Sequence, residues 1–297
     1  MNDEIDLRQL RYFLAVAETL HFTRAAKKLG IAQPPLSQQI RKLEQNLGYP
    51  LFVRSTRGVR LTPAGKLLST RAQATLDKIR NDMAEVRRIG RGEEGTLTVA
   101  FSGSIMFTNL PLAIQDYRRR FPRVELRLRE LTTAAQIASL LDRSIDLGFL
   151  RDGDPTEGVH VETLLKERFL AVLPQSHPLA AKATLRMKDL ATEPFILFAR
   201  SHGALAWDRT IACCERAGFT PNIVQNAPQF PTVIRLVAAG LGVSLVPACL
   251  ANLGIPGAVY RDIHSPVRTT VDAGMRLGSA CTMTANFLRL AQRHLAT

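Results

Sequence analysis

Polar side chains that can recognise a nucleic acid gather on one face of a helix predicted near residues 34–47. At about 100° per residue, the apolar stripe of this helix consists of Leu36, Ile40, Leu43 and Leu47. The opposite face carries Pro34, Ser37, Gln38, Arg41 and Gln45 and lacks a carboxylate. Gln, Ser and Arg side chains suit hydrogen bonding to base edges and phosphates. The alternative is an ordinary solvated helix face.

Three arginines follow this helix in a predicted hairpin. Two short apolar runs, 51–53 and 59–61, flank a polar turn that contains Gly58. The arginines are Arg54, Arg57 and Arg60. A basic hairpin beside a reading helix indicates a wing that lies on the DNA backbone or in the minor groove.

A second set of polar residues follows the predicted strands of the rest of the chain. Ligands of open parallel sheets bind outside the carboxyl ends of the strands. The candidates at these ends are Ser102, Gly103, Ser104, Thr132, Thr133, Arg151, Arg200, Ser201 and His202. Hydroxyls and backbone amides at helix N-termini suit an anion, so we expect a small carboxylate ligand. The alternative is a set of ordinary turns with capping Ser and Thr residues.

The N-terminal elements that would position the reading face form a helix-turn-helix. Apolar residues at helical spacing predict a helix over 7–20. A second helix is predicted to start at Thr23 as its N-cap and to stop at Gly30. The third helix opens with Pro34 and Pro35, which first-turn positions tolerate. The alternative is a small three-helix bundle with a polar face.

A long helix is predicted after Thr62 and Pro63, without a helix breaker before residue 89. Its coiled-coil-like seam consists of Leu68, Ala72, Leu76, Ile79, Met83 and Val86. Such a helix needs a partner, and we expect its twin in a second copy of the chain. The alternative partner is the C-terminal domain of the same chain. Residues 90–95 are predicted to be a flexible polar linker and a domain boundary.

The remaining sequence predicts an α/β domain of two lobes. Strands are expected at 96–101, 124–131, 145–150, 159–173, 194–198, 222–225, 243–247, 258–263 and from Val267 onward. Helices are expected near 107–121, 133–143, 205–217, 230–240 and 283–295. Such alternation implies parallel sheets with crossover helices. We expect the chain to cross into the second lobe within 159–173 and to return near Val267.

Composition and charge agree with this organisation. The chain has 297 residues, enough for two or three domains, and a net charge of +13. Residues 1–91 hold 17 Lys/Arg against 8 Asp/Glu, which favours a polyanionic partner for this part; a merely solvated basic surface is the alternative, and charge alone does not decide between the two. Without an apolar run of membrane-spanning length or a signal peptide, a cytoplasmic location is expected. Four cysteines fit a reducing compartment.

The N-terminal motifs resemble those of the LysR-type transcriptional regulators. The matching motifs are Leu10-Arg11-Tyr12-Phe13, Phe22-Thr23-Arg24-Ala25-Ala26, Gln33-Pro34-Pro35-Leu36-Ser37-Gln38-Gln39-Ile40, Leu43-Glu44, Leu51-Phe52 and Leu61-Thr62-Pro63-Ala64-Gly65. Gln33-Pro34-Pro35 with Gly103-Ser104 resembles the subgroup of muconate-, benzoate- and acetate-responsive activators.

The resemblance implies an N-terminal, largely helical winged helix-turn-helix domain (1–61), a linker helix for dimerisation (62–91) and an effector-binding domain (92–297). The last resembles periplasmic binding proteins, with two Rossmann-like lobes (about 94–163 with 267–297, and about 164–266). It also implies a homodimer, a tetramer built as a dimer of dimers, promoter DNA and RNA polymerase as partners, and a small ligand that changes DNA bending. No metal or cofactor is expected.

The resemblance also assigns roles to single residues. The expected DNA-binding set is Thr23, Gln33, Pro34, Pro35, Ser37, Gln38, Arg41, Arg54 and Arg57. The expected effector-binding set is Ser102, Gly103, Ser104, Thr133, Arg151, Arg200, Ser201, His202 and Phe230. Where several relatives carry Arg in the recognition helix, this chain has Gln38.

Three other classes of protein fit less well. An enzyme is disfavoured because the chain has no complete dinucleotide fingerprint, P-loop or nucleophile elbow, and its six histidines lack metal-ligand spacing. A redox sensor is disfavoured because adjacent Cys213 and Cys214 on one helix point to different faces. The basic N-terminal third and the lack of an export signal disfavour a free-standing solute-binding protein.

Overall fold

The computed structural model describes residues 6–55, 58–279 and 281–296. The chain divides into two compact units, Met1–Arg87 and Arg88–Thr297, which we describe separately. Within the described residues, no helix is both long enough and apolar enough to cross a membrane.

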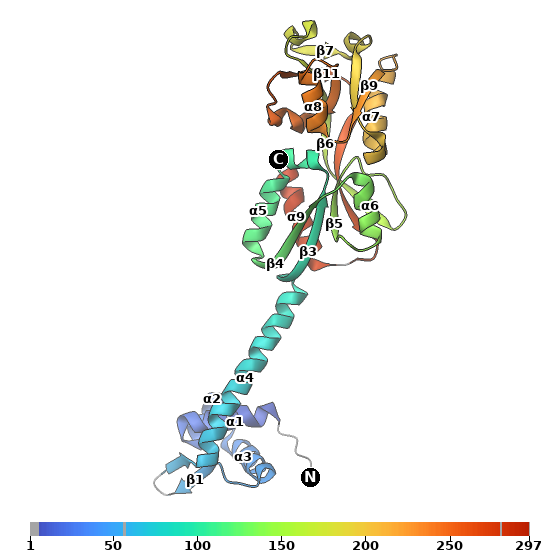
Figure 1. Cartoon of the computed structure of the whole chain (residues 1–297). Coiled ribbons are helices and arrows are strands. Elements are labelled where there is room, and N and C mark those ends of the chain that lie inside the picture. Colours follow the sequence, from blue (N-terminus) through green and yellow to red (C-terminus); the bar gives the residue numbers. More distant parts are fainter. Residues whose placement is uncertain (1–5, 56–57, 280, 297) are drawn as a thin grey trace. The chain divides into compact units, whose positions relative to one another are not determined.

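The N-terminal unit is a helix-turn-helix with a wing, followed by a long helix (Figure 1). Its elements are α1 (Leu7–Thr19), α2 (Phe22–Leu29), α3 (Gln33–Leu47), β1 (Phe52–Ser55), β2 (Gly58–Leu61) and α4 (Pro63–Gly90). Leu36, Ile40 and Leu43 of α3 are fully buried against Phe13 of α1, as the apolar stripe predicts. Helices α2 and α3 end at Gly30 and Gly48, whose φ values of 68° and 75° favour glycine.

One predicted cap is wrong. Helix α2 begins at Phe22, its N-cap is His21, and Thr23 lies inside the first turn. The burial of Phe22 in the helix-turn-helix core draws the helix start toward the N-terminus. The N-cap predicted for the long helix is confirmed, since the Gly65 amide donates to Thr62 Oγ1 at 2.9 Å.

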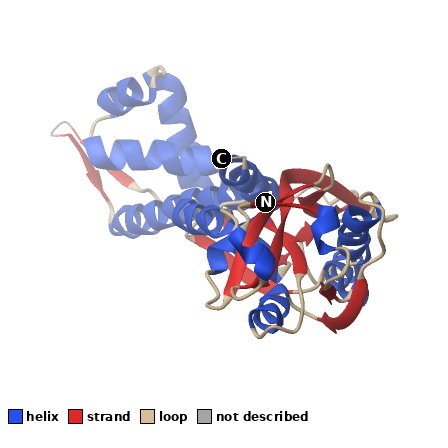
Figure 2. Ribbon diagram, turned by 90° about the horizontal axis from the view of Figure 1, so that it is seen from above, coloured by secondary structure: helices blue, strands red, loops and turns tan. Residues whose placement is uncertain are grey.

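The first lobe of the C-terminal unit is built on five neighbouring strands of an eight-stranded sheet, in the order β4–β3–β5–β12–β6. These strands are β3 (Glu94–Phe101), β4 (Arg123–Glu130), β5 (Leu147–Arg151), β6 (Val159–Pro174) and β12 (Arg268–Arg276). The helices of this lobe are α5 (Leu110–Arg120), α6 (Thr133–Leu141) and α9 (Thr282–Leu295). Strands and helices are layered as expected of an α/β fold (Figure 2).

The second lobe is reached through β6, as predicted. Residues 159–168 of this strand pair with β12, whereas residues 169–174 pair with β10 (Ser244–Pro247) and β11 (Ala258–His264). The other strands are β7 (Thr184–Arg186), β8 (Pro194–Phe198) and β9 (Asn222–Ala227). Helices α7 (Ala204–Glu215) and α8 (Phe230–Ala238) pack on this lobe. The short strand β7 is not predicted, because three residues carry no detectable periodicity.

The prediction of a flexible linker at 90–95 is wrong. The carbonyls of Gly90 and Arg91 accept hydrogen bonds from α9, from Thr282 Oγ1 at 3.3 Å and Asn286 Nδ2 at 3.1 Å. Gly92 has a φ of +66°, and a Cβ there would lie 2.6 Å from the backbone nitrogen of Met283. The glycines therefore allow a close approach to α9.

We expect Gly92→Ala to destabilise the C-terminal unit by about 1–3 kcal/mol, because the new methyl group meets backbone in a left-handed conformation. Gly90→Ala is the matched control, since nothing lies within 4 Å of a Cβ at this helical position. Urea unfolding of the full chain, followed by fluorescence of Trp207, the only tryptophan, measures both variants. Equal stability of the two variants would contradict the packed arrangement.

Candidate functional site

The reading face predicted on α3 is accessible. Gln33, Pro34, Pro35, Gln38 and Arg41 are exposed, and Ser37 is half-buried. Thr23 on α2 is also exposed. The two prolines occupy the first turn of α3, where missing amide hydrogens leave no intrahelical bond broken. The N-terminal half of α3 thus presents hydrogen-bonding side chains on a helix fixed by its buried opposite face.

The wing is held against α3 by Glu44. Its Oε1 accepts hydrogen bonds from the backbone amides of Leu51 (2.8 Å) and Phe52 (3.2 Å). Its Oε2 lies 3.5 Å from the Arg54 guanidinium, which sits 4.5 Å from the centroid of the Phe22 ring. Arg54 therefore has a structural role beside the predicted DNA contact. Arg57 lies outside the described residues.

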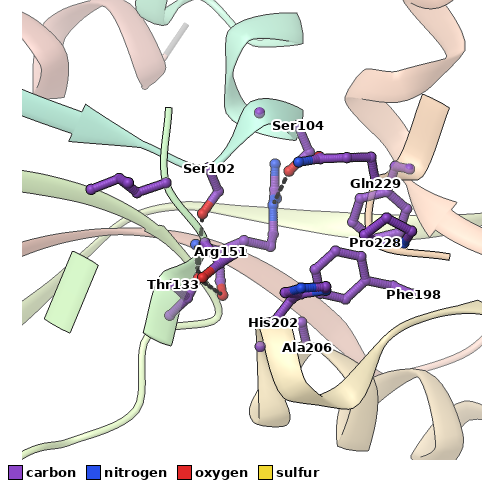
Figure 3. Close-up of a pocket in the computed structure, with 14 residues that line it drawn as sticks. Ser102, Ser104, Thr133, Arg151, Phe198, His202, Ala206, Pro228 and Gln229 are labelled. Carbon is purple, nitrogen blue, oxygen red and sulfur yellow. Dashed lines mark hydrogen bonds between the residues drawn. The ribbon is translucent and has the colours of Figure 1, made fainter. Parts of the chain in front are cut away.

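The second candidate site is a cavity of about 30 Å³ between the two lobes. Its lining from the first lobe is Ser102, Gly103, Ser104, Leu131, Thr132, Thr133 and Arg151. The second lobe contributes Phe198, His202, Gly203, Ala206, Pro228, Gln229 and Phe230. Figure 3 shows Ser102, Thr133 and Arg151 on one side and Phe198, His202 and Ala206 on the other. This volume holds a water molecule or two.

Arg151 organises the first-lobe wall. Its side chain is 4% exposed and pairs with Glu167 at 2.5 Å, and its Nε donates to Ser104 Oγ at 3.2 Å. Its Nη2 lies 3.6 Å from the sulfur of Cys249. Burial, the largest single effect, lowers the pKa of Arg151, but the combined effect of Glu167, Cys249 and Asp152 raises this pKa above its ordinary value. The guanidinium is thus a fixed, permanently charged group at the cavity.

The hydroxyls of this wall form a connected network. Thr133 Oγ1 donates to the Arg151 carbonyl at 3.0 Å and lies 3.3 Å from Ser102 Oγ. Gln136 Nε2 donates to Ser102 Oγ at 3.1 Å and to the Phe149 carbonyl at 3.1 Å. Gln136 is fully buried and is absent from the predicted set. Its partners Ser102 and Phe149 are distant in the sequence, so only the folded structure shows these contacts.

Three of the seven residues in the second-lobe wall carry aromatic rings. Phe198 and Phe230 stack with ring centroids 5.0 Å apart and planes 11° from parallel. His202 Nδ1 is buried and has no hydrogen-bond partner among the described residues. An unpaired imidazole nitrogen beside two phenyl rings is available to a ligand. Phe198 is a lining residue that the sequence analysis missed, although it ends a predicted strand as the other candidates do.

The structure brings seven of the nine predicted effector residues to the cavity. They are Ser102, Gly103, Ser104, Thr133, Arg151, His202 and Phe230. Arg200 and Ser201 are outside its lining. Arg200 instead pairs with Asp208 at 3.1 Å and covers the Trp207 ring, because it begins a short 3-10 helix that directs it to α7.

The four cysteines are free. Burial raises the pKa values of Cys213, Cys214 and Cys249, for the last two to about 12. Such thiols are poor nucleophiles at neutral pH, which argues against these three as redox-sensing cysteines. In the described part of the chain, no cluster of three or more His, Cys, Asp and Glu side chains could hold a metal ion.

Two family models match the chain. The model described as "Bacterial regulatory helix-turn-helix protein, lysR family" matches residues 7–66, and "LysR substrate binding domain" matches residues 90–295. Together they cover the reading helix, the wing and every residue that lines the cavity.

Relatives of known name are similar along most of their length. The chain is 39% identical to the transcriptional regulator AlsR of Bacillus subtilis over 257 residues, 86% of this chain and 85% of AlsR. It is 41% identical to the transcriptional regulator CatR of Pseudomonas putida, covering 82% of this chain and 83% of CatR. These proteins are transcriptional regulators, in agreement with the prediction that the chain is not an enzyme.

Solved structures of regulators have the same fold. The crystal structure of CbnR, a LysR family transcriptional regulator, superposes with a TM-score of 0.81 at 28% identity, covering 97% of this chain and 100% of CbnR. Full-length CbnR complexed with its target DNA superposes with a TM-score of 0.77 at 28% identity, covering 98% of this chain and 100% of CbnR. The chain therefore belongs to the LysR family of DNA-binding transcriptional regulators.

Proposed function

We propose that this regulator senses a small metabolite in the cavity between its two lobes and changes promoter DNA bending and transcription in response. The observation that carries the proposal is the polar and aromatic lining around Arg151, with His202 Nδ1 unpaired in the opposite wall. The proposed functional parts are the DNA-binding domain (1–61), the dimerisation helix (62–91) and the effector-binding domain (92–297).

A small carboxylate is the proposed ligand class. Arg151 and the hydroxyls of Ser102 and Ser104 supply donors that suit an anion. Because Glu167 already neutralises Arg151, a bound carboxylate would have to share the guanidinium with Glu167. The cavity of about 30 Å³ also favours a ligand of few atoms unless the lobes move apart.

Ser104→Ala is expected to weaken ligand binding by about 1–3 kcal/mol, because it leaves Arg151 Nε without its acceptor and removes a ligand donor. Thermal unfolding of the full chain against acetate, benzoate, muconate, amino acids and acetamide measures the effect as a lost stabilisation. Ser201→Ala is the matched control outside the cavity and should respond like the parent chain. A ligand-induced shift that is unchanged in Ser104→Ala would remove Ser104 from the site.

The proposed DNA-binding residues divide into two groups. Gln33, Ser37 and Gln38 lie on the N-terminal half of α3 and are proposed to form hydrogen bonds with base edges. Pro34 and Pro35 are proposed to make van der Waals contacts with the DNA. Thr23, Arg41, Arg54 and Arg57 suit phosphate contacts. Thr23 and Arg41 are exposed and therefore accessible to phosphates.

Gln38→Ala and Arg57→Ala should separate the two kinds of contact. Gln38→Ala is expected to weaken binding to a duplex selected from a random pool by about 1–3 kcal/mol, with little change on a scrambled duplex. Arg57→Ala should weaken binding to both duplexes and lower the slope of log K against log salt by about one. Fluorescence anisotropy over a salt series measures both. The assignment fails if the two variants give the same pattern.

A homodimer through α4 is the proposed assembly, and a tetramer of two such dimers follows from the family resemblance. Met83, Val86 and Ile89 of α4 are more than half exposed. Leu14, Leu29, Leu76, Ile79 and Met83 line a groove of about 500 Å³ in the N-terminal unit. Charged residues also line this groove, namely Arg11, Glu18, Lys28, Arg80 and Arg87. A groove of mixed apolar and charged character beside an exposed apolar seam fits the same helix of a second copy, which is itself amphipathic. We also infer a cytoplasmic location and a contact with RNA polymerase, since the relatives are bacterial transcriptional regulators.

Met83→Glu is expected to convert the dimer to monomers, because it places a charge in the proposed apolar contact. Asn81→Glu is the matched control, since Asn81 is exposed and lies on the opposite face of the helix. Sedimentation velocity of the full chain distinguishes the two species. A dimer that survives Met83→Glu at the same concentration would place the interface elsewhere.

A further inference from the structure

A buried carboxylate lies directly behind the cavity. Asp152 follows the cavity residue Arg151 and is only 1% exposed, with a left-handed φ of 52°. Its carboxylate accepts hydrogen bonds from Thr269 Oγ1 at 2.7 Å and from the Thr270 amide at 2.8 Å. Thr270 Oγ1 also contacts Asp272, a second buried carboxylate, at 2.6 Å. Negative charge is thus concentrated where β12 crosses between the lobes.

The guanidinium that faces this carboxylate comes from the other lobe. Arg209 of α7 places Nη1 at 3.1 Å from Asp152 Oδ1 and at 2.6 Å from the carbonyl of Arg268, the first residue of β12. Helix α7 starts in the cavity wall, where Gly203 and Ala206 line the cavity, and Arg209 lies one turn further along. The ion pair therefore joins the two walls between which a ligand would bind.

We propose that Arg209 is a positioning residue of the sensor: its pair with Asp152 holds the cavity closed, and this pair must break to admit the ligand. The proposal rests on the proposed function, which gives the cavity its ligand. The cavity offers about 30 Å³, room for a water molecule or two, so binding a larger ligand requires the lobes to separate. Separation takes Arg209 away from Asp152, because the two residues belong to different lobes.

The surroundings of the Arg209–Asp152 ion pair favour the closed arrangement of the lobes. A carboxylate at 1% exposure is costly without a cation, whereas Arg209, at 28% side-chain exposure, can reach water when the lobes part. Asp272 adds a second buried negative charge close to Asp152, bridged by the Thr270 hydroxyl. The guanidinium therefore favours the closed arrangement, and the pair is broken only at a cost in free energy.

Cys249 is a built-in reporter of opening. It lies in the second lobe, in the 3-10 helix that follows β10, and its sulfur contacts the Ser104 carbonyl of the first lobe at 3.5 Å. Its backbone amide donates to Glu167 at 3.0 Å. The residue is 9% exposed, and separation of the lobes uncovers it. Cys214 is fully buried in the core of the second lobe and serves as the reporter of unfolding, and Cys213, which is 1% exposed and lines a surface pocket, lies beside it.

The test is the rate at which iodoacetamide alkylates each cysteine of the full native chain, followed by peptide mass spectrometry. We expect Arg209→Met to raise the Cys249 rate about tenfold and Arg209→Lys to raise it much less, since lysine keeps the charge. Asp152→Asn should resemble Arg209→Met. The double variant Asp152→Asn/Arg209→Met leaves neither partner charge unpaired and should match the single variants rather than add to them.

Two results would overturn the proposal. One is a Cys249 rate in the double variant equal to that of the parent chain. The other is a parallel rise at Cys213 and Cys214, which would mean that the ion pair maintains the fold and not the closed cavity. Alkylation needs no effector, so this test is independent of the ligand test with Ser104→Ala. Either result above would overturn the role of Arg209 and leave the proposed sensing function untouched. Conversely, a failed ligand test would overturn the sensing function and leave the alkylation result valid.

Discussion

One buried guanidinium constrains the architecture of the ligand cavity. A charge as buried as that of Arg151 is stable only when it is paired, so the surrounding elements must bring their acceptors to it. Ser104 comes from the turn after β3, Glu167 from the crossing strand β6, and Cys249 from the second lobe. The position of each cavity wall therefore depends on one side chain at the end of β5.

In the DNA-binding domain, too, one charged side chain holds neighbouring elements together, but here it is a carboxylate. Glu44 on the recognition helix holds two wing amides and the Arg54 guanidinium, so the helix and the wing are fixed as one surface. A carboxylate next to a DNA-reading face is unfavourable toward phosphates, and its engagement with these three donors accounts for its presence there.

Most of the fold could be predicted from local patterns, because nearly every helix and strand has its own period and its own breakers. Examples are the single glycines that end α2 and α3, Gly30 and Gly48, and the long strand β6. The same local rules predicted Thr23 as a cap and residues 90–95 as a flexible linker, and both predictions were wrong. The burial of Phe22 and the packing of Gly92 on α9 decide these two places, and both are contacts with residues distant in the sequence. At the cavity, strand ends identified Ser102, Thr133 and Arg151, whereas Glu167, Gln136 and Arg209 contribute through partners distant in sequence.

The two walls of the cavity differ in how freely they can change during evolution. In the first-lobe wall, Ser104, Thr133 and Arg151 share one hydrogen-bond network, so a substitution at any of them disturbs the others. In the second-lobe wall, Phe198 and Phe230 are held by ring stacking, and an aromatic pair accepts other apolar side chains of similar volume. The shape of the second-lobe wall can therefore change without disturbing the hydrogen bonds that fix the first-lobe wall.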